Sequence, residues 1–358
     1  MKKIILLLII VVILLAFTLV CSAEDRVDGY INDFGELLPE ELKEDYKSGT
    51  LADAAELRGL FSLIIAAISD GRANILGFFL SLVGVSALCA ATSLVGGGLA
   101  ERVQTAVGII CSVTVFLQVR PLVSAVEEGI GRISGFFSSL IPIAAGLTAL
   151  GGGEATSLVQ ATGMYTAFSL VGGAMGKIFL TLTSFGLAGG LLTAFGGEGI
   201  GSVLRGVRGL FGWLTGIFTA LITASFSLQT LLAASADSAA MRAIKYAASG
   251  LIPVVGSTVS AAISTLASGI SYAKGVIGGG AILVILYMAI SPLVLILTYR
   301  LMLSLAMILA DLVGGSMASG IFSAYRQALD MTVTAYALSA LIYLFEIIIF
   351  IKIGVAVL

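Results

Sequence analysis

Nine apolar runs with few internal charges follow one another along most of this chain. They are Ile75–Val95, Val103–Val119, Ile133–Leu150, Thr156–Gly176, Ile178–Phe195, Leu210–Ala236, Gly278–Thr298, Leu301–Val313 and Thr332–Ile351. A bilayer offers the backbone no hydrogen-bond partners, so only helices or closed barrels cross it, and a helix needs about 20 apolar residues. The runs lack the alternation of a barrel. We therefore predict an all-α polytopic membrane helical bundle in which seven or eight runs cross, with Leu301–Val313 too short to cross alone.

The composition excludes a soluble globular protein and a nucleic-acid-binding protein. The chain of 358 residues is 58% hydrophobic and only 11% charged, whereas about 25% charged is usual for soluble domains. No basic cluster is larger than Arg205/Arg208 or Arg242/Lys245. The predicted partner is the lipid bilayer rather than nucleic acid.

The first 58 residues differ from the rest. Two lysines, 17 mostly apolar residues and a small-residue site at Cys21-Ser22-Ala23 predict a signal peptide over residues 1–23. An uncleaved anchor helix is the main alternative, because the apolar run is long, and a lipoprotein at Cys21 is a weaker one. Residues 24–58 contain 11 acids and four bases, a net charge of −7, so we predict an acidic extracytoplasmic segment there. Residues 59–358 form the predicted multispan membrane domain.

A short motif occurs twice and predicts an internal duplication. The sequence Leu-Ile-Pro, followed by two aliphatic or small residues, contains Pro142 in the first copy and Pro253 in the second, 111 residues later. A glutamine lies 24 residues before each proline, at Gln118 and Gln229. Residues 75–176 and 178–298 are the candidate pseudo-repeats, and residues 301–358 form an added C-terminal hairpin. A chance match of two apolar runs is the alternative.

The two prolines predict interrupted helices. Proline removes a backbone donor and disfavours helical geometry in the residue before it, so we expect Pro142 and Pro253 to break their segments near each other and to line a polar space. Glycine pairs and triplets between the runs are expected to end helices. A hydroxyl stripe follows the second proline at helical spacing and could face a pore or bond a neighbouring helix. The candidate pathway residues after this proline are Gly256, Ser257, Ser260 and Ser264, and the stripe continues to Ser271.

The acid Glu346 is the strongest single candidate for a functional residue. It lies between Phe345 and Ile347 in the last apolar run. An acid at the centre of a membrane helix costs about 2.5–3.5 kcal/mol on insertion scales. Glu346 therefore needs a polar partner or water, and Lys352 lies on a different face of a helix.

The residue inventory disfavours catalysis. The chain has no histidine, which removes the commonest base and metal ligand, and no phosphate-binding loop sequence that would indicate ATP binding. We predict no enzyme activity, no cofactor and no metal. Any energy from ATP would come from a separate ATPase.

The stretch Tyr246-Ala247-Ala248-Ser249-Gly250-Leu251-Ile252-Pro253-Val254-Val255-Gly256, together with the signal-like start, the acidic segment and the last run with Glu346, resembles the stage III sporulation protein AE family. The resemblance implies a polytopic protein of the mother-cell membrane around the forespore. It also implies a place in a multi-protein channel between the two cells, with other stage III sporulation membrane proteins and an ATPase supplied in trans. The family provides no catalytic residues to transfer.

Three functions are compatible with these features. The first is the membrane component of a sporulation channel complex, as the resemblance implies. The second is a stand-alone secondary transporter or permease with Glu346 at its substrate or proton site. The third is a membrane scaffold that recruits partners through residues 24–58. Cargo, orientation and oligomeric state, including a homo-oligomer, stay open at this stage.

Overall fold

A computed structural model describes residues 72–93, 100–150, 154–193, 198–251 and 256–353, together with residues 34, 36–38 and 43; within these ranges, the side chains of residues 232–270 and of several residues at the helix ends lie outside the description. Every regular element in the described ranges is helical. They are α6 (Arg72–Ser93), α7 (Ala100–Leu150), α8 (Glu154–Phe168), the π-helical stretch η1 (Ser169–Met175), α9 (Gly176–Leu192), α10 (Glu198–Leu251), α11 (Gly256–Leu312) and α12 (Ser316–Ile353). The prediction of an all-α membrane protein is confirmed, since six helical segments are long and apolar enough to cross a membrane.

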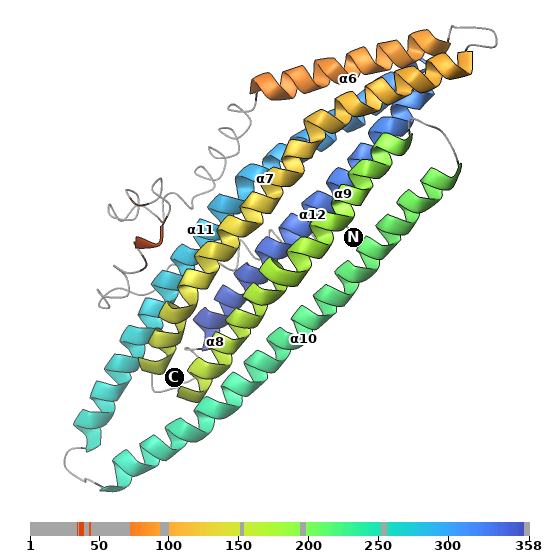
Figure 1. The fold of residues 1–358 in the computed structure, drawn as a ribbon. Coiled ribbons are helices and arrows are strands. Elements are labelled where there is room, and N and C mark those ends of the chain that lie inside the picture. Colours follow the sequence, from red (N-terminus) through yellow and green to blue (C-terminus); the bar gives the residue numbers. More distant parts are fainter. Residues whose placement is uncertain are drawn as a thin grey trace.

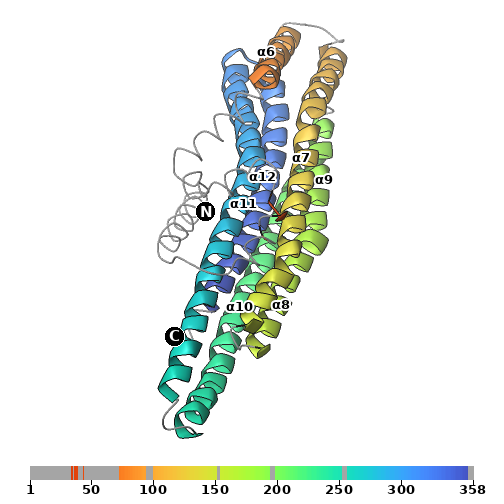
Figure 2. The ribbon, with the colours of Figure 1, turned by 90° about the vertical axis from the view of Figure 1, so that its left-hand side faces the viewer.

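The helices form one elongated bundle around α12 (Figure 1). In an 18-residue apolar stretch of α12, 72% of the residues are buried, against 17% in the corresponding stretch of α10. Helices α7, α9 and α11 surround α12, and α10 lies at the outside of the bundle (Figures 1 and 2). Because α12 is central, an acidic side chain on this helix can be buried in the interior of the bundle.

Several predicted breaks are absent because long helices continue through them. Val103–Val119 and Ile133–Leu150 belong to the single helix α7, which contains Pro121 and Pro142. Gly278–Thr298 and Leu301–Val313 both lie in α11. The π-helical stretch η1 joins α8 directly to α9. The nine runs therefore become six helical segments.

The predicted break at Pro142 is wrong. Pro142 lies on an exposed face of α7, while Leu140, Ile143 and Ala144 beside it are buried against the rest of the bundle. The helix continues through Pro142 despite the missing backbone donor, and buried residues flank the proline on either side. Proline is tolerated in membrane helices where the surroundings compensate in this way. Pro253 lies outside the described residues.

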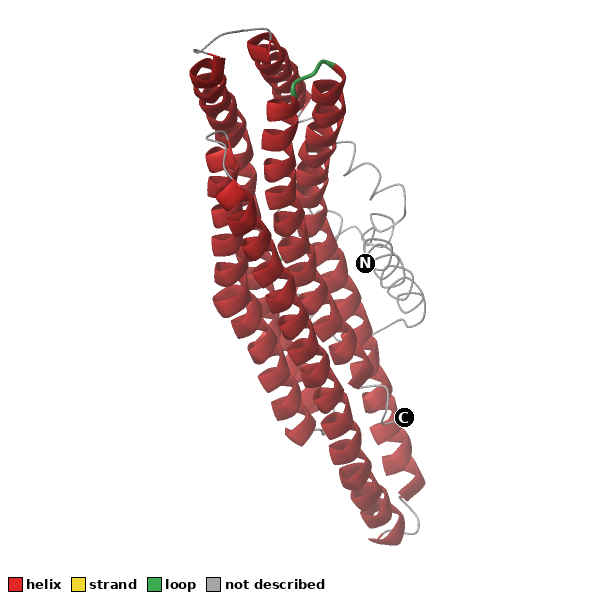
Figure 3. Ribbon diagram, turned by 90° about the vertical axis from the view of Figure 1, so that its right-hand side faces the viewer, coloured by secondary structure: helices red, strands yellow, loops and turns green. Residues whose placement is uncertain are grey.

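The glycines have two different roles. At Gly278, inside α11, an added Cβ would collide with the side chain of Ile351 on α12, so this predicted break is wrong and glycine permits close helix packing instead. Gly314-Gly315 does form the predicted break. Gly314 has a φ of 78°, and the backbone NH of Gly315 donates to the carbonyl of Ala310 at 2.8 Å. This turn reverses the chain between α11 and α12 (Figure 3).

The described part of the acidic segment contacts the bundle. Phe34 and Leu38 are buried, and the ring of Phe34 lies 6.3 Å from that of Phe136 on α7 in an edge-to-face arrangement. A Cβ added at Gly280 on α11 would approach this ring to 2.8 Å. At least this part of residues 24–58 therefore packs on the helices. The signal peptide and the duplication stay predictions.

Candidate functional site

Glu346 lies on the buried face of α12 and is 1% exposed. Its neighbours on that face include Tyr343 and Phe350, which are fully buried. Residues at three- and four-residue spacing share one face of a helix, so the apolar pattern that places these rings in the core places the carboxyl there too. The acid identified from the sequence therefore lies away from the protein surface.

The partner of Glu346 is Gln229 on α10. The amide Nε2 of Gln229 donates a hydrogen bond to Oε1 of Glu346 at 2.9 Å, and Gln229 is only 5% exposed. A second, longer contact of 3.4 Å joins Nε2 to the hydroxyl of Ser225, one turn earlier on α10. The amide therefore bridges the most peripheral helix to the most buried one.

A glycine on α8 makes room for this pair. A Cβ added at Gly163 would collide with the carboxamide of Gln229. Met164 beside it is fully buried. Three helices thus meet at the site: α8 contributes the space, α10 the amide and α12 the carboxyl.

Two oxygen atoms of the pair have no hydrogen-bond partner among the described residues. They are Oε2 of Glu346 and Oε1 of Gln229, and both are buried. A buried acceptor without a donor costs about 1–3 kcal/mol, and more when the group is charged. The site is polar but incomplete, which is expected where a proton, a water molecule or a ligand completes it.

Aromatic rings of three helices lie close to the site. The rings of Phe226 on α10 and Phe345 on α12 lie 5.9 Å apart. On the side of α7, Phe137 packs 4.5 Å from Tyr343, and the hydroxyls of Tyr343 and Ser134 are 2.7 Å apart. The carboxyl–amide pair therefore lies in an apolar, weakly screening environment.

One cation lies near this region. Lys274 on α11 is 3% exposed, and its Nζ lies 5.6 Å from the centre of the Phe350 ring. Phe350 is one helical turn beyond Glu346. Among the described hydrogen bonds and ion pairs, the carboxyl of Glu346 is joined to the amide of Gln229 and not to Lys274. Lys274 was not among the predicted candidates.

Of the other predicted pathway residues, the structure describes the side chain of Pro142 alone. Pro142 is exposed on α7, so it does not share the buried space of Glu346. Pro253 lies outside the described residues. Gly256, Ser257, Ser260 and Ser264 fall in the first turns of α11, but their side chains lie outside the description. The predicted hydroxyl-lined conduit therefore stays a prediction.

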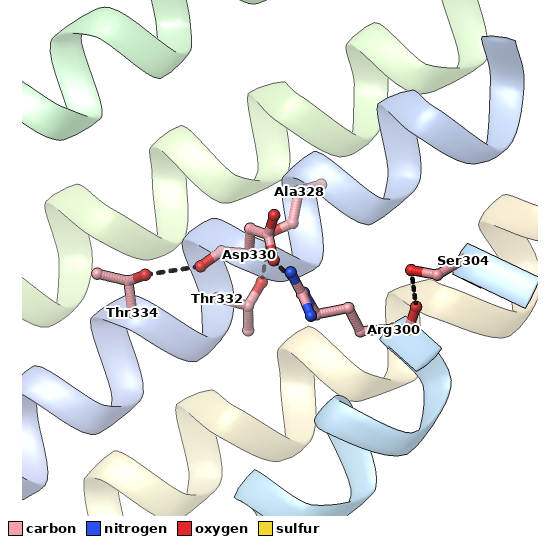
Figure 4. A network of polar contacts seen from close by, with 6 residues as sticks. All are labelled: Arg300, Ser304, Ala328, Asp330, Thr332 and Thr334. Atoms are coloured by element: carbon pink, nitrogen blue, oxygen red, sulfur yellow. Dashed lines mark hydrogen bonds and ion pairs between the residues drawn. The ribbon is translucent and has the colours of Figure 1, made fainter. Parts of the chain in front are cut away.

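A second polar contact inside the bundle was missed. Nε of Arg300 on α11 forms an ion pair with Oδ1 of Asp330 on α12, and the two side chains are 26% and 30% exposed. Figure 4 shows the two side chains reaching toward each other between the helices. Nε of Arg326, one turn before Asp330, is buried without a hydrogen-bond partner. The sequence does contain a sign of this ion pair, because Arg300 interrupts an apolar stretch. Its position between the runs Gly278–Thr298 and Leu301–Val313 indicated a boundary instead.

Away from the Glu346 site, two tyrosines of α12 form hydrogen bonds with neighbouring helices. The hydroxyl of Tyr325 donates to the carbonyl of Ser112 on α7 at 2.9 Å, and that of Tyr336 donates to the carbonyl of Met288 on α11 at 3.1 Å. Both rings are fully buried. These contacts fix α12 within the bundle, and with it the position of Glu346.

Among the described residues, no group of three or more His, Cys, Asp or Glu residues is suited to hold a metal ion. The chemistry available at the Glu346 site is proton binding and hydrogen bonding.

Comparison with known proteins gives one match. The family model described as stage III sporulation protein AE matches residues 93–355. No curated protein and no solved structure matches the chain. The matched region begins at the end of α6 and includes α7 to α12, so it contains all three helices of the carboxyl–amide site.

Proposed function

The chain belongs to the stage III sporulation protein AE family, and on that basis we propose that it is the multi-pass membrane component of a channel complex between mother cell and forespore. The observation that carries this proposal is the extent of the family match, which includes α7 to α12. We place the protein in the mother-cell membrane that surrounds the forespore.

The complex would contain partners that supply what this chain lacks. Its sequence has no phosphate-binding loop for ATP, so an ATPase acting in trans would provide energy. Other stage III sporulation membrane proteins would contact the exposed apolar faces of the bundle. Helix α10 is the best candidate for such contact, because few residues of its span are buried.

Within this complex we assign a functional role to the pair of Glu346 and Gln229. A buried acid in a membrane helix is costly and marks functional sites more often than structural ones. The pair joins the peripheral helix α10 to the central helix α12, so a change at the pair would alter how these two helices pack.

Genetic complementation tests the proposal. Deleting the gene should stop spore formation after the forespore forms, and the wild-type chain should restore heat-resistant spores. A tagged chain should co-purify with other stage III sporulation membrane proteins and an ATPase, and should localise to the membrane around the forespore. Normal spore yield after deletion, or a tagged chain that purifies alone from sporulating cells, would overturn the assignment.

A stand-alone permease is the second candidate, and the buried Glu346–Gln229 pair favours it. The two functions differ in their dependence on partners. A permease would transport its substrate in vesicles that contain only this chain, whereas the channel component would need the rest of the complex.

A further inference from the structure

We propose that Glu346 and Gln229 form a proton-binding site in which Glu346 holds one proton and shares it with the amide of Gln229. This inference goes beyond the proposed function, because it concerns the chemical state of one buried pair and its readout does not depend on sporulation. The proton comes from water and returns to water, so no other reactant is needed.

The first argument is the balance of hydrogen-bond donors and acceptors within the pair. The pair already has one bond, from Nε2 of Gln229 to Oε1 of Glu346. The two atoms left over, Oε2 of Glu346 and Oε1 of Gln229, are both acceptors and both buried without a donor. A carboxylic acid has one OH donor that a carboxylate lacks. One proton on Oε2 of Glu346 therefore gives the pair the donor it is missing and lets the acid and the amide bond through both of their ends.

The charge balance is the second argument. An ionised Glu346 would be an acid with 1% exposure and a single neutral hydrogen-bond donor. The helices around it offer Gln229 and Ser225 on α10, Gly163 on α8, Ser134 on α7 and Lys274 on α11. Of these groups only Lys274 is charged, and it lies against Phe350 and makes no ion pair with Glu346. Burying an uncompensated charge is far more costly than burying the neutral acid.

The number of ligands favours a proton over a metal cation. Calcium takes six to eight oxygen ligands and magnesium about six. Beyond the two unpaired oxygens of Glu346 and Gln229, the site offers the hydroxyl of Ser225, which already contacts the amide. A proton needs only one donor atom and one acceptor atom, and this is what the site provides.

The proton would control the contact between α10 and α12. At this level of the bundle the described contact includes the Gln229–Glu346 bond and the packing of Phe226 on Phe345 and Ile349. Loss of the proton would leave a carboxylate facing these rings and an amide oxygen without a donor. The ionised pair would be stable only with water beside it, so deprotonation should loosen α10 from the central helix.

Infrared spectroscopy of the full-length protein in lipid tests the proposal directly. A protonated carboxyl absorbs at higher frequency than the amide backbone, and a carboxylate does not. Near neutral pH, the wild-type spectrum minus that of E346Q should contain one such band, and this band should shift in E346D. The matched control E127Q removes an exposed acid of α7 and should leave the band in place. A difference spectrum without a protonated carboxyl band would overturn the proposal.

Thermal unfolding as a function of pH is the second measurement. A group that holds its proton in the folded protein and loses it on exposure stabilises the fold at low pH, and this stabilisation is lost as the pH rises. The unfolding temperature of the wild type should therefore fall more with rising pH than that of E346Q, in which the amide cannot ionise. Equal pH dependence in the two proteins, with E346Q folded, would count against a proton on Glu346.

Discussion

Tyr325 on α12 and Ser112 on α7 are joined by two contacts. The tyrosine hydroxyl donates to the serine carbonyl at 2.9 Å and lies 3.1 Å from the serine hydroxyl. Ser112 in turn donates to the carbonyl of Gly190 on α9 at 2.9 Å. A Cβ added at Gly190 would lie 2.9 Å from the tyrosine ring. Three helices are thus held together at one point, about six helical turns from Glu346.

Replacing Tyr325 by phenylalanine should destabilise the bundle. The ring would still pack, but the hydroxyl contacts with Ser112 would be lost, at a cost of about 1 kcal/mol. Thermal unfolding of the solubilised protein measures this change. Y299F is the matched control, because Tyr299 stacks on Phe78 with ring centres 4.6 Å apart and its hydroxyl has no hydrogen bond in the described structure. Equal effects of the two variants would contradict the role of the Tyr325 hydroxyl.

Adding a methyl group at Gly163 should displace Gln229. The collision predicted for a Cβ at this position should make G163A less stable by about 1–3 kcal/mol, the usual range for overpacking. G131A is the control, since a Cβ at Gly131 meets open space, and there alanine should be neutral or slightly stabilising. The double variant G163A/Q229A should recover part of the loss. Stability of G163A equal to that of the wild type would rule out the tight contact.

Cys89 and Cys111 should form a disulfide under a mild oxidant. Their sulfur atoms are 3.7 Å apart between α6 and α7, and both side chains are buried and free. In a C21S background, a membrane-permeable oxidant should produce an intramolecular bond that mass spectrometry detects. The variant C111S should stay reduced and monomeric. Absence of the bond, or crosslinking only between molecules, would contradict the packing of α6 on α7.

Exchanging the two charged residues of the Arg300–Asp330 ion pair should destabilise the protein less than removing the charge of Asp330. D330N leaves the guanidinium of Arg300 without its anion and should cost about 1.5–3 kcal/mol, as expected for a hydrogen bond to a charged group. The exchanged variant R300D/D330R restores opposite charges and should recover part of the stability. Unfolding temperatures of the three proteins provide the measurement. No difference between D330N and the exchanged variant would show that the pair contributes little.

The helical class of the fold was predictable because it follows from the apolar runs alone. The helix boundaries were less so. Sequence spacing identified the turn at Gly314, where the backbone has a positive φ. It could not distinguish that glycine from Gly278, which lies inside a helix and permits close packing against Ile351 of α12. Likewise, Pro142 predicts a break locally, and packing on both sides of it overrides that tendency.

The candidate site was half predictable. Glu346 stood out because an acid in an apolar run requires an explanation. Gln229 was noted only as a marker of the duplication, since nothing in a sequence indicates that residues 117 positions apart share a hydrogen bond. Gly163 carried no signal at all, because its role depends on the carboxamide that fills the space beside it.

The central position of α12 has a consequence for biosynthesis. α12 follows in sequence all the helices that it contacts, so during translation these helices enter the membrane before the helix that holds them together exists. Until α12 arrives, Ser112 lacks its contacts with Tyr325, and Gln229 lacks its hydrogen bond to Glu346. These polar groups therefore acquire their partners on α12 late, and the assembled bundle is a product of the final stage of synthesis. A ribosome that stalls before α12 would release a set of inserted helices without a core.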